Sequence, residues 1–310
     1  MLKRFTITVF ISLRLMVAMA QVPATAYSPM PGNADAAMII AKKELKQAGL
    51  NKDEPAKAKA YTGMALAYTY KGQTDSALLF YIKAKNIYLE NKNEAASAYT
   101  DIALAKVFIG QFKIDSALTY LLRADSLSTV TGNISMQADV NWMKGLVFKN
   151  KQDYSTAAGY FKKAMAAFYQ QNNFSKYISA GCNLSMAYRL MDQNDSSLRI
   201  LAQCLSVFNK QSPPDSLLYA NIRENYADTY LEMGNYAMAL HYFTEALAQF
   251  KKQKSTVDII YQKYSIGRTL TGMNRFKEAE SYLLDAYTLC DSLKNHKYLV
   301  WISNVLQEMY

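Results

Sequence analysis

Glycine, proline, cysteine and histidine are all scarce in this chain of 310 residues. The 12 Gly and 6 Pro are too few for the many turns of an all-β or loop-rich fold. Cys182, Cys204 and Cys290 are an odd number without metal-ligand spacing, which argues against a disulfide framework and against a zinc site. We expect each of them to be a buried free thiol.

Sequence patterns for catalysis are missing as well. His241 and His296 are the only histidines, and they lie too far apart for a metal-binding pair or an H-E-x-x-H motif. Glycine-rich phosphate loops are absent. Acidic pairs such as Glu278 and Glu280 stand among lysines at a helix start, where the helix dipole explains them. We therefore expect no enzyme activity, no cofactor and no metal site.

The formal net charge of +10 overstates the basicity of the main part of the chain. Residues 1–20 carry Lys3, Arg4 and Arg14 and no acid, so 35 − 3 = 32 basic residues remain against 25 acidic ones, a net charge of +7. The remaining lysines are spread along expected helix faces rather than gathered with aromatic residues and glycines. This distribution is typical of a solvated basic surface and argues against nucleic acid as a partner.

The N-terminus has the features of a secretory signal peptide. Lys3 and Arg4 form a positive region, Phe5–Leu13 is a short apolar run that Arg14 interrupts, and Ala18–Ala20 is an A-x-A cleavage site. We predict a signal peptide over 1–20, a linker over 21–33, and a periplasmic or extracellular location. The apolar run is too short to span a membrane, and no later segment is long and apolar enough to do so.

After residue 33 the sequence is organised by a repeat of small residues. The first set is Ala37, Ala77, Ala117, Ala157, Ser197, Ala239 and Ala279, spaced about 40 residues apart, with a slightly longer interval before Ala239. A second set follows seven positions later: Ala84, Ala124, Ala164, Cys204, Ala246 and Ala286. Between them stand bulky residues: Tyr81, Leu121, Phe161, Leu201, Phe243 and Leu283. Small residues let two antiparallel helices approach closely, and the bulky ones fill the space between repeats.

Glycines and short polar residues mark the expected turns. Gly72, Gly110 and Gly234 are predicted to end helices in a left-handed conformation. The next small residue stands further from Gly110 than the corresponding one stands from Gly72, so we expect a longer turn after Gly110. Asp75-Ser76 and Asp115-Ser116 are predicted to cap the helices that follow.

This pattern resembles the tetratricopeptide-repeat family over residues 34–310. The resemblance implies an all-α, right-handed superhelical solenoid of antiparallel helix pairs. It divides the chain into a half repeat at 34–54, six repeats of about 40 residues, and a terminal half repeat at 296–310. The period exceeds the family's usual repeat of about 34 residues, as in the extended repeats of kinesin light chains and bacterial peptide-pheromone receptors. HEAT and armadillo repeats share the longer period but lack these paired small residues.

The resemblance also implies a concave face, lined mainly by the first helix of each repeat, that binds a protein or peptide partner. The candidate ligand-binding residues are Thr62, Thr69, Thr100, Trp142, Lys149, Arg189, Asn221, Glu224, Asp228, Tyr261, Tyr264 and Arg268. They offer aromatic surface for stacking and charges of both signs for orientation. Family members that bind chaperones clamp a terminal carboxylate with lysine and asparagine at set positions. Thr62 and Leu66 occupy two of those positions here, so this clamp is missing.

The two ends of the repeat array are expected to differ. The helix at about 34–49 has a polar outer side with Lys42 and Lys43, and Ile40, Ala41 and Leu45 are expected to pack inward. The last helix, at about 297–310, carries apolar residues for which we expect no partner: Val300, Trp301, Val305, Leu306 and Met309. Because solenoids normally end in a polar cap, this end is expected to self-associate or to contact a further domain.

These observations favour a non-catalytic module that binds proteins or peptides. The first hypothesis is the exported sensory or interaction region of a larger signalling protein. The alternative is a free-standing periplasmic scaffold for assembly of envelope proteins. An envelope hydrolase is the remote third possibility, because the sequence offers no acid–base pair or nucleophile for it.

Overall fold

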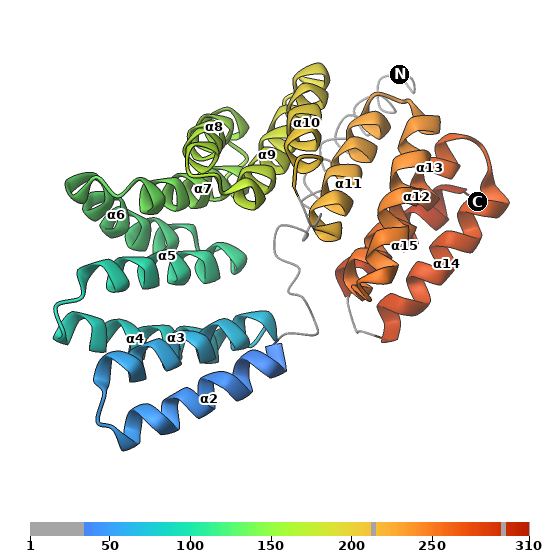
Figure 1. Cartoon of the computed structure of the whole chain (residues 1–310). Helices are drawn as coiled ribbons and strands as arrows, with labels where there is room; N and C mark the ends of the chain where they lie inside the picture. Colours follow the sequence, from blue (N-terminus) through green and yellow to red (C-terminus); the bar gives the residue numbers. More distant parts are fainter. Residues whose placement is uncertain (1–33, 212–214, 293–295, 310) are drawn as a thin grey trace, which may run out of the picture.

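The computed structural model describes residues 34–211, 215–292 and 296–309, and the predicted signal peptide and linker lie outside these ranges. The described ranges contain fourteen α-helices and no strand (Figure 1). The helices are α2 (Ala34–Leu50), α3 (Glu54–Tyr70), α4 (Thr74–Glu90), α5 (Glu94–Gly110), α6 (Ile114–Thr131), α7 (Ile134–Asn150), α8 (Tyr154–Gln170), α9 (Phe174–Arg189), α10 (Asn194–Phe208), α11 (Ser216–Glu232), α12 (Tyr236–Lys252), α13 (Thr256–Gly272), α14 (Phe276–Ser292) and α15 (His296–Met309). The all-α fold class is confirmed.

Eleven of the connections between successive helices use one kind of turn. Residues with φ between 53° and 72° recur every twenty positions from 52 to 192 and again at 234, 254 and 274. In the first turn the N–H of Asp53 donates to the carbonyl of Ala48 at 2.9 Å, and the N–H of Lys52 donates to that of Gly49 at 3.3 Å. These two bonds define a Schellman motif, which satisfies carbonyls at the end of the first helix.

The expectation of a longer turn after Gly110 is wrong. Gly110 is the last residue of α5, and the left-handed conformation falls on Phe112, with φ 58°. Phe112 occupies the same place in its repeat as Gly72 does in the repeat before, so the two turns have equal length. The repeat is set by the packing of the helices, and a non-glycine residue accepts the strained backbone angle where the sequence offers no glycine.

Short polar side chains cap seven of the helices, but not at the predicted places. Each cap side chain accepts a hydrogen bond from a backbone N–H two or three residues further along the chain. The cap residues are Asp53, Asn93, Asn133, Asp153, Asn173, Asp215 and Asn235. Gln73 and Lys113 occupy the cap positions of α4 and α6 and make no such bond. Asp75 and Asp115 lie inside the first turns, so the predicted caps at Asp75-Ser76 and Asp115-Ser116 are wrong.

The packing predicted from the small residues is confirmed. From Ala77 to Ala279 and from Ala84 to Ala286, every member of both sets is completely buried. The bulky residues between them are buried too, and Phe161 packs against Gly145 so closely that a Cβ on Gly145 would be 2.5 Å from its ring. At this joint α8 therefore lies directly on the backbone of α7.

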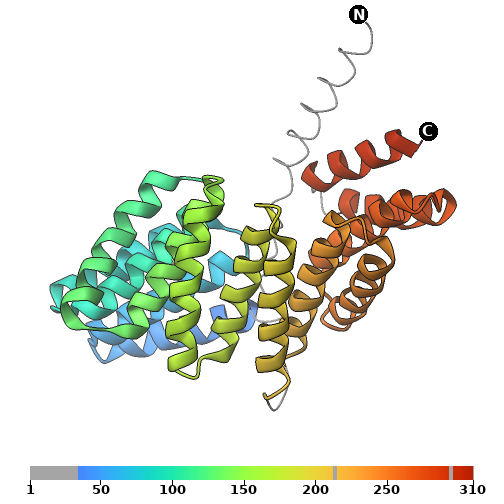
Figure 2. The same ribbon diagram turned by 90° about the horizontal axis from the view of Figure 1, so that it is seen from above.

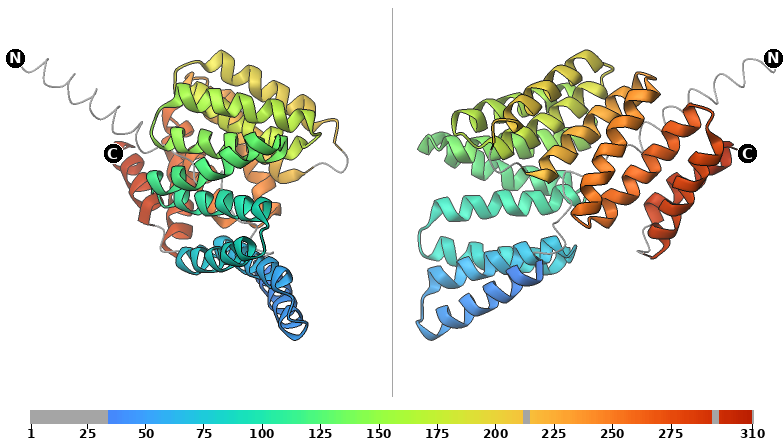
Figure 3. Two further views of the ribbon diagram at one scale, coloured as in Figure 1. Left: turned by 90° about the vertical axis from the view of Figure 1, so that its left-hand side faces the viewer. Right: turned by 45° about the vertical axis from the view of Figure 1, so that its right-hand side comes forward.

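The helix pairs follow an arc in which the odd-numbered helices form the inner layer. In Figure 1 α5, α7, α9 and α11 lie inside the bend, and α6, α8, α10 and α12 lie outside it. Inner helices also contact one another from pair to pair, as α5 does with α7 and α9 with α11. Figure 2 shows the successive pairs side by side, and Figure 3 shows α2 and α14 at opposite ends of the stack. None of the described helices is long and apolar enough to cross a membrane.

Both terminal helices differ from expectation. In α2 the inward residues are Met38 and Ala41, whereas Ile40 is 58% exposed, so the expectation for Ile40 is wrong. In α15 Val305 is buried because the helix packs on α13 as well as on α14. Trp301, Leu306 and Met309 are half-buried against the same core, and only Val300 of the five expected residues is exposed.

Candidate functional site

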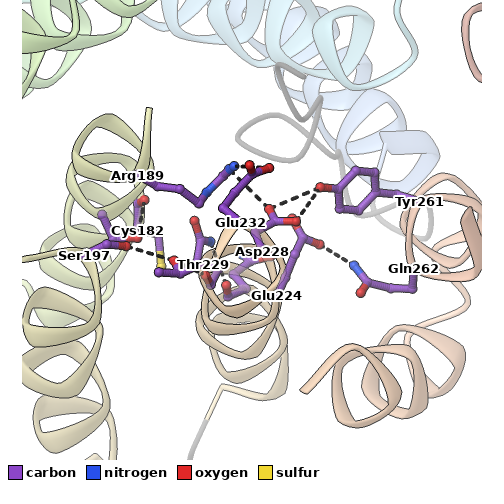
Figure 4. Close-up of polar contacts among 12 residues, drawn as sticks. Cys182, Arg189, Ser197, Glu224, Asp228, Thr229, Glu232, Tyr261 and Gln262 are labelled. Atoms are coloured by element: carbon purple, nitrogen blue, oxygen red, sulfur yellow. Dashed lines mark hydrogen bonds and ion pairs between the residues drawn. The ribbon is translucent and has the colours of Figure 1, made fainter. Parts of the chain in front are cut away.

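A network of buried charges crosses the inner layer from α9 to α13 (Figure 4). Arg189, in the last turn of α9, places Nη2 3.4 Å from Oδ2 of Asp228 and Nη1 3.8 Å from Oε1 of Glu232, both on α11. Arg189 and Asp228 are only 5% and 6% exposed. Charged groups lose hydration when buried, so such a pair persists only where its members satisfy each other.

The network continues from α11 to α13 through two further contacts. The hydroxyl of Tyr261 donates to both carboxylate oxygens of Asp228, at 2.9 and 3.1 Å. The side-chain amide of Gln262 donates to the carboxylate of Glu224. Burial raises the pKa of Asp228 in spite of the nearby Arg189, and it raises the pKa of Tyr261 well above the ordinary value. Three inner helices are thus held together by polar groups in a fixed arrangement.

Aromatic residues extend this surface towards α15. The guanidinium carbon of Arg268 lies 5.8 Å from the centre of the Tyr264 ring, which is a cation–π contact. The Tyr264 and Trp301 rings lie 5.8 Å apart, and Trp301 meets Tyr298 edge to face at 5.2 Å. Stacking surface therefore adjoins the charged network.

A pocket of about 90 Å³ opens between α7, α9 and α11. It is lined by Trp142, Ser179, Cys182, Asn183, Met186, Leu218, Asn221 and Asn225. Two of its lining residues carry buried polar atoms without a hydrogen-bond partner among the described residues, Nε1 of Trp142 and Oδ1 of Asn183. An unpaired buried donor beside an unpaired buried acceptor favours any occupant that satisfies both.

Lys149, near the end of α7, is buried without a charged partner in the part of the chain that the structure describes. Only 3% of the surface of Lys149 is exposed to solvent. Burial lowers the pKa of its ammonium group to about 8. This lysine is therefore a poorly compensated charge on the inner layer.

The threonines among the candidates lie apart from this network. Thr62 and Thr69 are on α3, and their hydroxyls donate to the carbonyls of Ala58 and Ala65 in the same helix. Thr100 is 3% exposed and its hydroxyl donates to its own helix, whereas the preceding Tyr99 is 39% exposed. The repeat register places Tyr99, rather than Thr100, on the accessible side of α5.

The other candidates are brought together. Arg189, Glu224, Asp228, Tyr261, Tyr264 and Arg268 form the network and its aromatic border, and Trp142 and Asn221 line the pocket. Sequence reasoning missed Asn183, Asn225, Glu232 and Gln262. Asn225 and Glu232 each follow a named candidate, Asn221 and Asp228, by four positions, so helical spacing is the signal that could have found these two.

The three cysteine thiols are poor nucleophiles. Cys182, Cys204 and Cys290 are buried free thiols. Burial raises the pKa of Cys204 to about 12 and that of Cys290 to about 11, so the reactive thiolate is disfavoured. Within the described residues there is no group of three His, Cys, Asp or Glu side chains that could hold a metal ion. His241 is exposed on the outer helix α12.

Stacked helix pairs with small residues at their joints define a helical-repeat fold. The tetratricopeptide repeat model matches residues 177–252, which span most of α9 to α12. This part of the chain is therefore similar to tetratricopeptide repeats, and the helix pairs on either side of it continue the same architecture. None of the curated proteins matches this sequence.

Solved structures share the fold at low sequence identity. A Rap protein complexed with competence and sporulation factor is 18% identical, with a TM-score of 0.67, covering 85% of this chain and 72% of that one. Aspartyl phosphate phosphatase F from Bacillus subtilis is 16% identical, with a TM-score of 0.66, covering 85% and 69%. PilW, a type IV pilus biogenesis factor, is 16% identical, with a TM-score of 0.57, covering 80% and 98%.

Proposed function

We propose that the inner layer from α7 to α13 binds an extended segment of a protein or peptide partner, and that the chain is the exported sensory or interaction region of a larger signalling protein. The buried network of Arg189, Asp228 and Tyr261 carries this proposal. Its side chains are fixed by contacts between helices before any partner arrives. Binding groups that are already ordered lose little conformational entropy on association.

The position of polar groups supports the choice of the inner layer. Glu224 and Gln262 are almost completely buried there, although burial of such groups is costly. On the outer helices α10 and α12, Arg199 and Lys252 are simply exposed to solvent. A Rap protein of similar fold is known in complex with competence and sporulation factor, so this architecture can carry a bound partner.

The N-terminal sequence supports export. Lys3, Arg4 and the apolar run before Ala18–Ala20 have the order of a signal peptide. A sensory region outside the cytoplasm would meet partners that the rest of a signalling protein cannot reach.

A free-standing scaffold for assembly of envelope proteins is the second candidate function. It is favoured by the fold shared with PilW, a type IV pilus biogenesis factor, 98% of which is covered. Such a scaffold would use the same inner layer but bind a structural protein rather than a signal.

A random peptide library displayed on phage tests the binding proposal. The mature chain, purified after expression with its native leader, is expected to enrich peptides that bind the inner layer. Ser179→Phe fills the pocket from its edge and Arg189→Ala removes the centre of the network, so both should abolish enrichment. The matched changes Ser206→Phe and Arg199→Ala, on exposed positions of α10, should leave it intact.

The contrary results are equally clear. If the enriched peptides lose affinity for the α10 variants but keep it for the inner-layer variants, the binding surface lies on the outer layer. Absence of any enrichment, with circular dichroism showing a folded chain, would contradict the proposal.

A further inference from the structure

Lys149 and Arg189 occupy equivalent places in neighbouring repeats but have different surroundings. They stand one repeat apart, each in the last turn of an inner helix, and each is almost fully buried. Arg189 lies within ion-pair distance of Asp228 and Glu232 on the next inner helix. Lys149 has no ion pair or hydrogen bond from Nζ to any described residue.

The repeat explains why Lys149 lacks carboxylates. The starting positions of α9 and α11 set the offset between these helices. With this offset the counterpart of Asp228 is Met186 on α9, and that of Glu232 is Leu190, the residue that follows α9. Both are apolar. The dipole of α7 favours a cation in its last turn, but this contribution is small compared with the cost of burying an unpaired ammonium group. The fold therefore holds a cation whose counter-charge it does not supply.

The pocket at Trp142 lies on the same side of α7 as Lys149. Seven residues separate them, which is two helical turns and about 10.5 Å along the axis. Met186 lines the pocket and, in the repeat, corresponds to Asp228, the partner of Arg189. The unpaired Nε1 donor of Trp142 and Oδ1 acceptor of Asn183 together complement a carboxamide, which has one acceptor and two N–H donors.

We propose that α7 and α9 form a two-part subsite for an acidic partner segment, with a carboxylate paired to Lys149 and a carboxamide side chain in the pocket at Trp142. The inference rests on the proposed function. An extended chain advances about 3.3 Å per residue, so about three residues separate the two groups of the partner. A glutamine and a glutamate at this spacing match the site.

A basic partner does not fit this place. A second cation beside Lys149 would add like-charge repulsion in a region of low dielectric constant, where it is poorly screened. A carboxylate instead provides the charge-assisted hydrogen bond that Arg189 already has in the next repeat. The same carboxylate could come from a side chain or from a chain terminus, and a terminal probe distinguishes the two.

Synthetic octapeptides with blocked ends test the subsite. The reference peptides carry Gln and Glu three residues apart, in both orders, in an alanine and serine background. Comparison peptides replace Glu by Gln or Lys, or replace Gln by Ala. One further peptide lacks the Glu and has a free C-terminal carboxylate at its place. Calorimetry with the mature chain is expected to show about tenfold weaker binding for each loss of a matched group.

Variants of the protein show whether Lys149 itself is responsible for the preference for a negatively charged peptide residue. Lys149→Met should remove the preference for Glu over Gln, while Lys149→Arg should keep it. Lys252→Met, the same change at an exposed position of α12, should leave the preference unchanged. Because the measured quantity is a ratio between two peptides, a general loss of folded protein does not imitate the expected result.

Each outcome bears on a different proposal. A Glu preference that persists in Lys149→Met, or a stronger preference for Lys, overturns the subsite and leaves the proposed function standing on the library selection. Failure of every octapeptide while library peptides still bind also overturns the subsite. Failure of both the octapeptides and the library contradicts the proposed function as well.

Discussion

The sulfur of Cys204 on α10 occupies the place where a side chain on Gly181 of α9 would lie. A Cβ added to Gly181 would stand 2.2 Å from this sulfur and 3.1 Å from the terminal methyl of Met165. Helix α9 is thus held between α8 and α10 without room for a single methyl group. The joint next to the pocket is among the most closely packed places in the chain.

Gly181→Ala should therefore destabilise the protein although alanine is the better helix former. Overpacking of this kind costs about 1–3 kcal/mol, more than the gain in helix propensity. Gly159→Ala on α8 is the matched control, since no atom lies within 4 Å of the added Cβ, and it should raise stability by up to about 1 kcal/mol. Urea denaturation followed by circular dichroism measures both. Equal effects of the two changes would contradict the close contact.

Ala157→Leu tests the repeat register in the same way. Ala157 is completely buried where α8 meets its neighbours, so the larger side chain should lower stability by about 1–3 kcal/mol. Ala166→Leu, at an exposed position of the same helix, should change the melting temperature little. A melting temperature that stays constant for Ala157→Leu would place this residue on the surface.

The repeat could be read from the sequence because its joints depend on residue size. Ala77, Ala117 and Ala157 have to be small for two helices to touch, and they recur at the same interval although the residues around them differ from repeat to repeat. The turns were harder to place. Phe112 adopts a left-handed backbone angle that the sequence suggests for Gly110, because tertiary packing fixes the helix length and overrides the local preference.

Breaking the Arg189–Asp228 pair should be costly. Arg189→Met leaves a buried carboxylate without its cation, and such losses are about 3–5 kcal/mol. Adding Asp228→Asn should recover part of the loss, because the amide can still accept the hydrogen bond from Tyr261. The defect of the single variant should also shrink at acidic pH, where Asp228 is protonated. Additive effects of the two changes at neutral pH would show that the residues do not interact.

Lys149→Met should stabilise the chain at pH 7 and lose this advantage at higher pH. The ammonium group has a pKa of about 8 when folded and 10.5 in its ordinary state, so the unfolded chain binds more protons between these values. The wild-type protein consequently gains stability relative to the variant as pH rises through this window, by at most about 3 kcal/mol.

The difference between the two proteins isolates this effect from tyrosines and cysteines that titrate in the same range. Lys252→Met, at an exposed site, should show an offset from wild type that does not vary with pH. A pH-independent offset for Lys149→Met would mean that Lys149 is hydrated in the folded chain.

Expression with the native leader tests export. The mature chain should begin at Gln21 in material from the cell envelope, because the A-x-A site ends at Ala20. Ala18→Leu together with Ala20→Leu should block cleavage and leave the leader attached. N-terminal sequencing or mass spectrometry of the intact protein identifies its first residue. A chain that starts at Met1 and stays in the cytosol would contradict the assignment.

The candidate site was only partly predictable. Arg189, Glu224 and Asp228 could be placed on the inner layer from the resemblance to the tetratricopeptide repeat. Which of them would meet depends on how far each inner helix is displaced from the next, and that displacement changes at the longer interval between α9 and α11. For the same reason the apolar counterparts of Asp228 and Glu232 opposite Lys149 depend on where α9 and α11 begin.

The uniform turns make the chain divisible at regular points. The backbone of Phe112 and that of Gln152 have nearly the same left-handed angle, 58° and 62°, and Lys113 and Asp153 follow them as cap residues. A gene that lost the codons for 113–152 would join Phe112 to Asp153 and recreate the same connection between two full-length helices. Lengths of such arrays can therefore change by one whole repeat in a single event, with only the side chains at one new joint left to adapt.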